Sequence, residues 1–215
     1  VTVNKITLWL SAKEYSLIQL PQELLLLQNC GLEICFCDDI LSYKKLLPAL
    51  KKYPNDTIIT FDDDVIYPKT HIERLVNLHN SYPTDVVCHR AHRVANNDQG
   101  EIKPYLHWDF DINNNHDESM AGGNIFPIGI GGVLYPKGCF HNEVFNQELF
   151  MQVAPHADDV WFKIMSLKQG VKSRVVANAL PYRQYLLLPD TQKKSLWAKN
   201  QTNNDKQLQA LIAIY

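Results

Sequence analysis

Cysteine, glycine and long apolar runs are scarce in this 215-residue sequence, and each shortage excludes a class of protein. The 5 cysteines are an odd number and are too few in 215 residues for a dense disulfide scaffold. The 9 glycines form neither a G-x-G-x-x-G nor a G-x-x-x-x-G-K-[ST] phosphate loop. No apolar run reaches the roughly 18 residues that a membrane-spanning helix needs.

Charge of one sign is also lacking, since 21 Lys and Arg face 23 Asp and Glu. The resulting net charge of −2 offers no basic field for a nucleic acid. What is present is 46% hydrophobic residues with a mean hydropathy of −0.23, which is typical of one ordinary soluble globular domain. We expect the cysteines to be buried or half-buried free thiols, as a reducing, cytoplasmic location favours.

Up to about residue 95, short apolar segments alternate with segments of helical pattern. This alternation predicts an α/β fold with a mostly parallel central sheet flanked by helices. The expected strands are residues 5–10, 32–37, 57–61 and 85–88, and the expected helices are residues 21–27, 42–53 (begun by Ser42 as a cap) and a helix opened by Pro68.

The pattern changes after about Val94, where residues 96–124 are rich in Asn, Asp and Gly. Long irregular segments of this kind often carry function. Trp108 and Phe110 lie within it and could either stack on the flat face of a bound ligand or form a small core under the loop. Regular structure is expected again as strands at 126–135 and 171–177 and helices at 140–153, 156–169 and 205–215, with residues 178–202 irregular.

Three consecutive aspartates, Asp62, Asp63 and Asp64, directly follow the apolar strand at residues 57–61. Ligands of open α/β sheets bind at the carboxyl ends of strands, and clustered carboxylates there need a compensating cation or hydrogen bonds. Alternation places Asp62 and Asp64 on one side and Asp63 on the other. Two carboxylates suit Mg²⁺ or Mn²⁺ together with substrate phosphates. The alternative is a solvated acidic turn in which Asp64 caps a helix.

Four segments in order resemble a known family. They are Asp38-Asp39 followed by Ser42-Tyr43-Lys44-Lys45-Leu46, the strand–D-x-D–Y-P arrangement, Gly131-Gly132-Val133-Leu134-Tyr135-Pro136, and Ala157-Asp158-Asp159-Val160-Trp161-Phe162. Over roughly residues 5–177 the chain resembles GT-A-fold, nucleotide-sugar-dependent glycosyltransferases of the bacterial family-2-like type, often linked to capsule or lipopolysaccharide assembly. The resemblance implies a nucleotide-binding half at residues 1–95 and an acceptor-side half at residues 96–215.

For the reacting groups, the resemblance implies that Asp62 and Asp64 bind Mn²⁺ or Mg²⁺ bridging the donor diphosphate. An acidic residue in the position of Asp158 or Asp159 is the general base on the acceptor hydroxyl, which an inverting transfer needs. We favour Asp159 slightly, and His156 is a weaker rival. Without the resemblance, both carboxylates could simply stabilise a helix N-terminus.

The resemblance also suggests donor contacts outside the metal site, for each of which a surface or packing role is the alternative. Lysines near the start of a helix could reach diphosphate oxygens, and Lys44 is preferred over Lys45. Asp39 could assist Asp38 at the ribose or base, and His92 shares a face with Arg90. The expected donor-contacting residues are Asp38, Lys44, Asp63, Arg90, Gly131 and Gly132.

The expected reaction is transfer of a sugar from a nucleotide diphosphate, with UDP favoured, to a carbohydrate hydroxyl, with inversion, in bacterial surface polysaccharide synthesis. The expected partners are the nucleotide-sugar donor and a carbohydrate acceptor, without nucleic acid or a transmembrane segment; peripheral membrane association is left open. Two rivals remain: another metal-dependent phosphate enzyme such as a nucleotidyltransferase, and a non-catalytic sugar- or nucleotide-binding module.

The segment at residues 5–10 resembles the second strand of the family rather than the first. We therefore expect the chain to lack about one β–α unit at its N-terminus. The sheet would then contain an unpaired position, and part of the nucleotide pocket would be absent.

Overall fold

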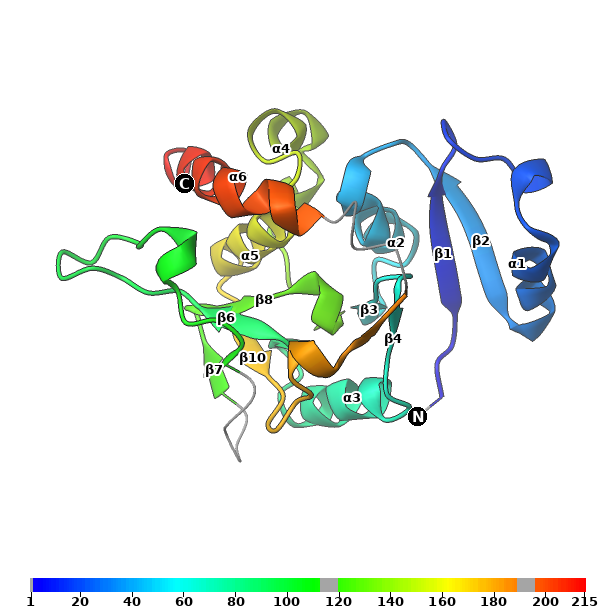
Figure 1. Ribbon diagram of the computed structural model, residues 1–215, viewed down its shortest axis with the longest axis horizontal. Helices are drawn as coiled ribbons and strands as arrows, with labels where there is room; N and C mark the ends of the chain where they lie inside the picture. The colour runs from blue at the N-terminus through cyan, green and yellow to red at the C-terminus, as the bar shows by residue number, and fades with distance from the viewer. Residues whose placement is uncertain (1, 113–119, 189–195) are drawn as a thin grey trace.

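The computed structural model describes residues 2–112, 120–188 and 196–215, and Figure 1 shows their arrangement. The helices are α1 (Gln22–Leu26), α2 (Leu47–Lys52), α3 (His71–Ser81), α4 (Gln147–Val153), α5 (Asp158–Lys168) and α6 (Leu196–Ile212). The strands are β1 (Ile6–Ser11), β2 (Leu32–Cys37), β3 (Ile58–Thr60), β4 (Val65–Ile66), β5 (Val86–Cys88), β6 (Ala91–Arg93), β7 (Met120–Gly122), β8 (Ile125–Pro127), β9 (Val133–Tyr135), β10 (Ser173–Val175) and β11 (Leu186–Leu187).

The central sheet has five strands in the order β3-β9-β5-β10-β7. Strands β3, β5 and β10 run in one direction, as the α/β prediction requires. The sheet is nevertheless mixed, because β9 lies antiparallel between β3 and β5, and β7 lies antiparallel beside β10. The expectation of mostly parallel pairing is therefore wrong in this sheet, where only β5 and β10 pair in parallel.

The predicted strand at residues 126–135 is in fact two strands. Strand β8 pairs with β6, whereas β9 enters the central sheet. Between them Gly129–Gly131 forms a short 3-10 helix, and Gly132 follows with a φ of 81°. A positive φ of this size is readily adopted only by glycine, so this residue allows the chain to turn back into the sheet.

Both faces of the central sheet are covered by helices. Val87 and Leu134 point to the side of α3, where they pack with the buried Leu75. Their neighbours Cys88 and Val133 point to the opposite side and join the larger core beneath α4 and α5. This alternation along each strand produces the layered α/β architecture that the sequence predicts.

The larger core fixes the segments that carry the polar site. Tyr43, in the 3-10 helix η3 (Leu41–Lys45), is fully buried and stacks on Phe150 of α4 at a centroid distance of 4.0 Å. Its ring also meets Phe162 of α5 edge-on, and its hydroxyl donates to the Ala154 carbonyl at 2.7 Å. Burying one such side chain contributes about 1.5–3 kcal/mol. The end of η3 is thereby anchored to the start of α5.

The single helix predicted from Ser42 to Tyr53 is wrong. Its first part is η3, and α2 begins at Leu47 with Pro48 in its first turn. Proline has no N–H to donate and suits the first turn of a helix, so Pro48 begins a new helix instead of lying inside an old one. The hydroxyl of Ser42 makes no capping hydrogen bond.

Strands β1 and β2 pair in parallel as a separate two-stranded sheet, with Ile6 opposite Leu32. With α1 they lie together at one side of the molecule (Figure 1). A pocket of about 440 Å³ is lined by residues of this sheet, of α2 and of α4, and by residues between them; its lining includes Trp9, Phe36, Asp38, Lys51 and Phe150. The expected absence of a β–α unit stays a prediction.

Two segments predicted to be irregular contain short strands, β7 within residues 96–124 and β11 within residues 178–202; their parts at residues 113–119 and 189–195 lie outside the described residues. All five cysteines are free thiols, as predicted, but Cys30 is exposed. Among the helices of the described ranges, none is long and apolar enough to cross a membrane.

Candidate active site

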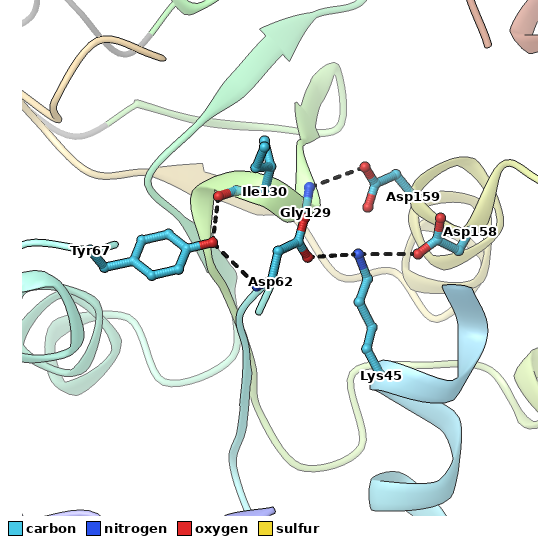
Figure 2. A network of polar contacts seen from close by, with 7 residues as sticks. All are labelled: Lys45, Asp62, Tyr67, Gly129, Ile130, Asp158 and Asp159. Atoms are coloured by element: carbon cyan, nitrogen blue, oxygen red, sulfur yellow. Dashed lines mark hydrogen bonds and ion pairs between the residues drawn. The ribbon is translucent and has the colours of Figure 1, made fainter. Parts of the chain in front are cut away.

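Carboxylates from distant parts of the chain converge on one lysine (Figure 2). Asp62 follows β3, Asp158 lies in the first turn of α5, and Lys45 is the last residue of η3. The Lys45 Nζ atom is 3.4 Å from Asp62 Oδ1 and 3.4 Å from Asp158 Oδ2. Beside them Asp159 accepts a hydrogen bond from the Gly129 N–H at 3.0 Å. We call Lys45, Asp62, Asp158 and Asp159 the acidic cluster.

The turn that carries the aspartates is held at both ends. The Asp62 N–H donates to the Tyr67 hydroxyl at 3.2 Å, and that hydroxyl donates to the Ile130 carbonyl at 2.8 Å. Beyond the turn, the Leu188 N–H donates to the Asp64 carbonyl at 2.9 Å, extending the pairing of β4 with β11. These contacts keep Asp62 directed toward Lys45. Tyr67 is part of the Y-P pair in the sequence, but its anchoring role was not predicted.

Burial and charge give Asp159 an unusual acidity. Its half-buried position raises its pKa to about 7, and the neighbouring charge of Asp158 adds to this effect. Lys45 and the Gly129 N–H act in the opposite direction. A carboxyl group that titrates near neutrality can accept a proton from a hydroxyl at physiological pH, which is what a general base requires.

Lys45 itself remains a cation. Burial alone would lower its pKa, but Asp158, Asp62 and Asp159 together raise the pKa well above its usual value. Its side chain is 26% exposed, against 27% for Asp62 and 9% for Asp158, so the cluster is open to solvent mainly on the Lys45–Asp62 side. A ligand can therefore approach the cluster from that side.

Of the three glycines Gly129, Gly131 and Gly132, Gly129 lies closest to the acidic cluster. A Cβ atom there would lie 2.7 Å from Lys45 Nζ and 3.0 Å from Asp159 Oδ1. At Gly131 a Cβ would lie 2.4 Å from Arg90 Cβ, and at Gly132 it would meet the Phe61 ring at 2.5 Å. Packing within the protein thus accounts for Gly131 and Gly132, whereas a sugar contact at either glycine stays a prediction.

The two neighbouring lysines have different surroundings. Lys44 pairs with Glu14 at 3.7 Å and Asp39 at 3.8 Å, whereas Lys45 enters the acidic cluster. In a 3-10 helix successive side chains point about 120° apart, so the two cannot share one partner set. Lys44 is the lysine predicted to contact the donor, although nothing in the local sequence distinguishes the two. A nucleotide contact by Lys44 or by Asp38, which lines the cavity near β1, stays a prediction.

Arg90 and His92 both contact Asp111, as their predicted position on one face of the strand implies. Arg90 Nε lies 2.6 Å from Asp111 Oδ1, and its guanidinium lies 4.0 Å from the Tyr182 ring centroid. His92 Nδ1 accepts the Asp111 N–H at 3.1 Å, and burial lowers the pKa of His92 to about 4. These are buried structural contacts, and a donor contact by Arg90 stays a prediction.

The alternatives for the loop aromatics separate in the structure. Trp108 is buried, donates its indole N–H to the Lys103 carbonyl at 2.8 Å and packs against Phe126, so the core interpretation is correct for it. Phe110 is 37% exposed and lies against His92. His156 is half-buried, and its backbone N–H donates to Gln207. Its role as a rival base stays a prediction.

The cluster fits a divalent cation only in combination with a substrate. Within the described ranges there is no group of three or more His, Cys, Asp or Glu side chains that could hold a metal ion. Asp62 and Asp64 carry carboxylate oxygens of the kind that hard cations prefer, and metal binding by either stays a prediction. The buried Asp158 Oδ2 has no hydrogen-bond donor within bonding geometry. Mg²⁺ and Mn²⁺ often bind through one or two carboxylates and complete their coordination with phosphate oxygens and water.

Comparison with known proteins identifies the class of protein. Residues 45–150 match the family described as Glycosyl transferase family 2, a stretch that begins at Lys45 and includes the aspartate turn and Gly129. A search of curated proteins found no match. The chain belongs to the family-2-like glycosyltransferases, which have the GT-A fold. It is therefore a sugar-transferring enzyme that uses a nucleotide-sugar donor and an acceptor.

Proposed function

We propose that this enzyme is a metal-dependent, inverting glycosyltransferase. It moves a sugar from a UDP-sugar to a carbohydrate hydroxyl in bacterial surface polysaccharide synthesis. The observation that carries the proposal is the acidic cluster, where Asp62 lies beside a carboxyl group with a pKa near 7. One end of the cluster suits a cation and diphosphate, and the other suits a hydroxyl that must lose its proton.

In this mechanism Asp159 in its ionised form accepts the proton of the acceptor hydroxyl as the new glycosidic bond forms. The Gly129 N–H fixes one oxygen of Asp159 and leaves the other for the acceptor. Asp62 and Asp64 would hold Mn²⁺ or Mg²⁺, which when bound stabilises negative charge on the departing nucleoside diphosphate. Asp63, which is exposed on the same turn, remains available to the donor ribose or sugar.

Attack from the side opposite the leaving group gives inversion, because Asp159 acts on the acceptor while Asp62 and Asp64 act on the diphosphate. Among the described residues we assign no further carboxylate to form a covalent sugar intermediate, and this supports inversion. The match to the glycosyltransferase family favours a transferase over the rival of a non-catalytic binding module.

Calorimetry with UDP and UTP, each with and without Mn²⁺, tests the proposal. We expect UDP to bind only in the presence of Mn²⁺, and Asp64→Ala to abolish this binding. The matched control is Asp56→Asn, which removes an exposed carboxylate outside the acidic cluster and should bind UDP normally. Tight UTP binding with no UDP binding would favour a nucleotidyltransferase and contradict the proposal.

A further inference from the structure

Lys45 and a metal ion bound at the aspartate turn would both contact the carboxylate of Asp62. The ammonium group contacts Asp62 Oδ1, an oxygen of the residue that we assign to the metal. It also contacts Asp158 on α5, so one cation links two carboxylates from different elements (Figure 2). Like charges at one carboxylate repel, and a cation bound at Asp62 therefore opposes the presence of Lys45 there.

The contacts of Lys45 are those of an exchangeable ion pair. Both N–O distances are 3.4 Å, longer than the roughly 2.7–2.9 Å of tight charge-assisted hydrogen bonds. Lysine is also a point charge on a flexible stem, with rotatable donors that suit carboxylates and phosphates equally. Lys45 can therefore leave Asp62 without the loss of a rigid bidentate contact.

The position of Lys45 also favours a second set of partners. Its side chain is 26% exposed, on the side of the cluster where a donor diphosphate would approach Asp62. The diphosphate brings more negative charge than one divalent cation neutralises, and a nearby ammonium would balance the remainder. Gly129 makes room for the ammonium group in its present position beside Asp62 and Asp158, since a Cβ there would lie 2.7 Å from Lys45 Nζ.

We propose that Lys45 is an exchangeable internal counter-ion, which neutralises Asp62 and Asp158 in the metal-free enzyme and turns to the donor diphosphate when a divalent cation binds Asp62. This inference rests on the proposed function, because it requires the metal at Asp62 and Asp64. It makes Lys45 a positioning residue for the acidic cluster before binding and a diphosphate contact afterwards. No covalent bond changes in this exchange.

The exchange predicts effects of opposite sign on two ligands, which a purely structural lysine would not produce. In Lys45→Met, affinity for Mn²⁺ alone should rise about 3- to 10-fold, because a competing charge is removed. Affinity for UDP at saturating Mn²⁺ should fall about 10-fold, because a diphosphate contact is lost. Lys45→Arg keeps the charge and should move both affinities less than Lys45→Met does.

The measurements are Mn²⁺ titration followed by electron paramagnetic resonance of the free ion, and UDP calorimetry. Lys69→Met is the matched control, because it removes an exposed lysine near the same turn and should leave both affinities unchanged. Circular dichroism checks folding, and Lys45→Gln serves as a second variant if the methionine variant does not fold.

A fall in both the Mn²⁺ and the UDP affinity, or no change in either, would overturn the proposal. Failure of both Lys45→Met and Lys45→Gln to fold would also overturn it, because Lys45 would then be a structural link. Asp64→Ala separates this inference from the proposed function. If the wild type binds Mn²⁺ through Asp64 while Lys45→Met behaves as wild type, only the role of Lys45 is wrong. If the wild type binds no Mn²⁺, both are wrong.

Discussion

The Gly129 N–H donates a hydrogen bond to Asp159 Oδ2 at 3.0 Å, and this contact joins the glycine-rich turn after β8 to the first turn of α5. It orients the carboxylate that we assign as the base. It also requires that residue 129 have no side chain, because Lys45 and Asp159 occupy the space where a Cβ would lie. The same residue thus fixes the base and makes room for the cation beside it.

Gly129→Ala should therefore impair transfer more than it impairs folding. The added Cβ would lie 2.7 Å from Lys45 Nζ, the flexible end of a side chain that can move away. Displacing the cluster should lower kcat/KM by roughly tenfold to hundredfold, since small misplacements of reacting groups are costly. Gly123→Ala is the control, because a Cβ there meets Leu167 at an ordinary 3.5 Å. Equal activity of the two variants would contradict this assignment.

The activity should depend on pH through Asp159. Only the ionised carboxylate accepts a proton, and its pKa is raised to about 7 by burial and by Asp158, with Lys45 opposing. Below this pKa, kcat/KM should fall about tenfold for each pH unit. A cation at Asp62 would shift the apparent pKa downward. Initial rates from about pH 5 to about pH 8 that are constant, or that fall as pH rises, would disagree with Asp159 as the base.

The same pKa shift has the opposite consequence for stability. The folded protein holds the Asp159 proton more tightly than the unfolded chain does, so ionisation destabilises the fold as pH rises from about 4 through about 7. Asp159→Asn should thus melt at a higher temperature than the wild type at pH 8. The difference in melting temperature should vanish below about pH 4, where Asp159 is neutral in both the folded protein and the unfolded chain. Differential scanning calorimetry measures this, and a lower melting temperature at pH 8 would be inconsistent with it.

Asp111 should matter for stability through the buried Arg90. The Arg90 side chain is 9% exposed, and its Nε contacts Asp111 Oδ1 at 2.6 Å. Asparagine tolerates the positive φ of 50° at residue 111, so Asp111→Asn removes the charge without straining the backbone. The substitution should lower the free energy of unfolding by on the order of 2 kcal/mol. Asp109→Asn, whose parent side chain is 63% exposed and 3.7 Å from Arg93, should be nearly neutral. Urea unfolding that ranks the two variants equally would refute the structural role.

The sequence located the acidic groups because their environment is local. A buried strand followed by Asp62-Asp63-Asp64 places carboxylates at a strand end, and Asp158-Asp159 before an apolar helical pattern places them in a first turn. Both placements depend only on neighbouring residues. Most elements of the α/β fold were predictable for the same reason. The exceptions are the helix that Pro48 divides, the strand predicted at residues 126–135, which is two strands, and the short strands β7 and β11.

The remaining features depend on contacts between distant segments. Nothing local distinguishes Lys45 from Lys44, since the packing of Tyr43 on Phe150 decides which of them reaches Asp62. Gly129, in preference to Gly131, faces the cluster because a turn divides β8 from β9. The antiparallel insertion of β9 between β3 and β5 also involves residues far apart in the chain. Periodicity carries no information on such pairings.

The most direct test of the account is the rate of UDP release from a panel of UDP-sugars, with water or added carbohydrate as acceptor. We predict that release requires Mn²⁺ or Mg²⁺, and that Asp159→Asn slows it about 100-fold or more while Asp56→Asn has the wild-type rate. Undiminished release in the presence of a chelator, or by Asp159→Asn, would contradict a metal-dependent transfer with Asp159 as its base.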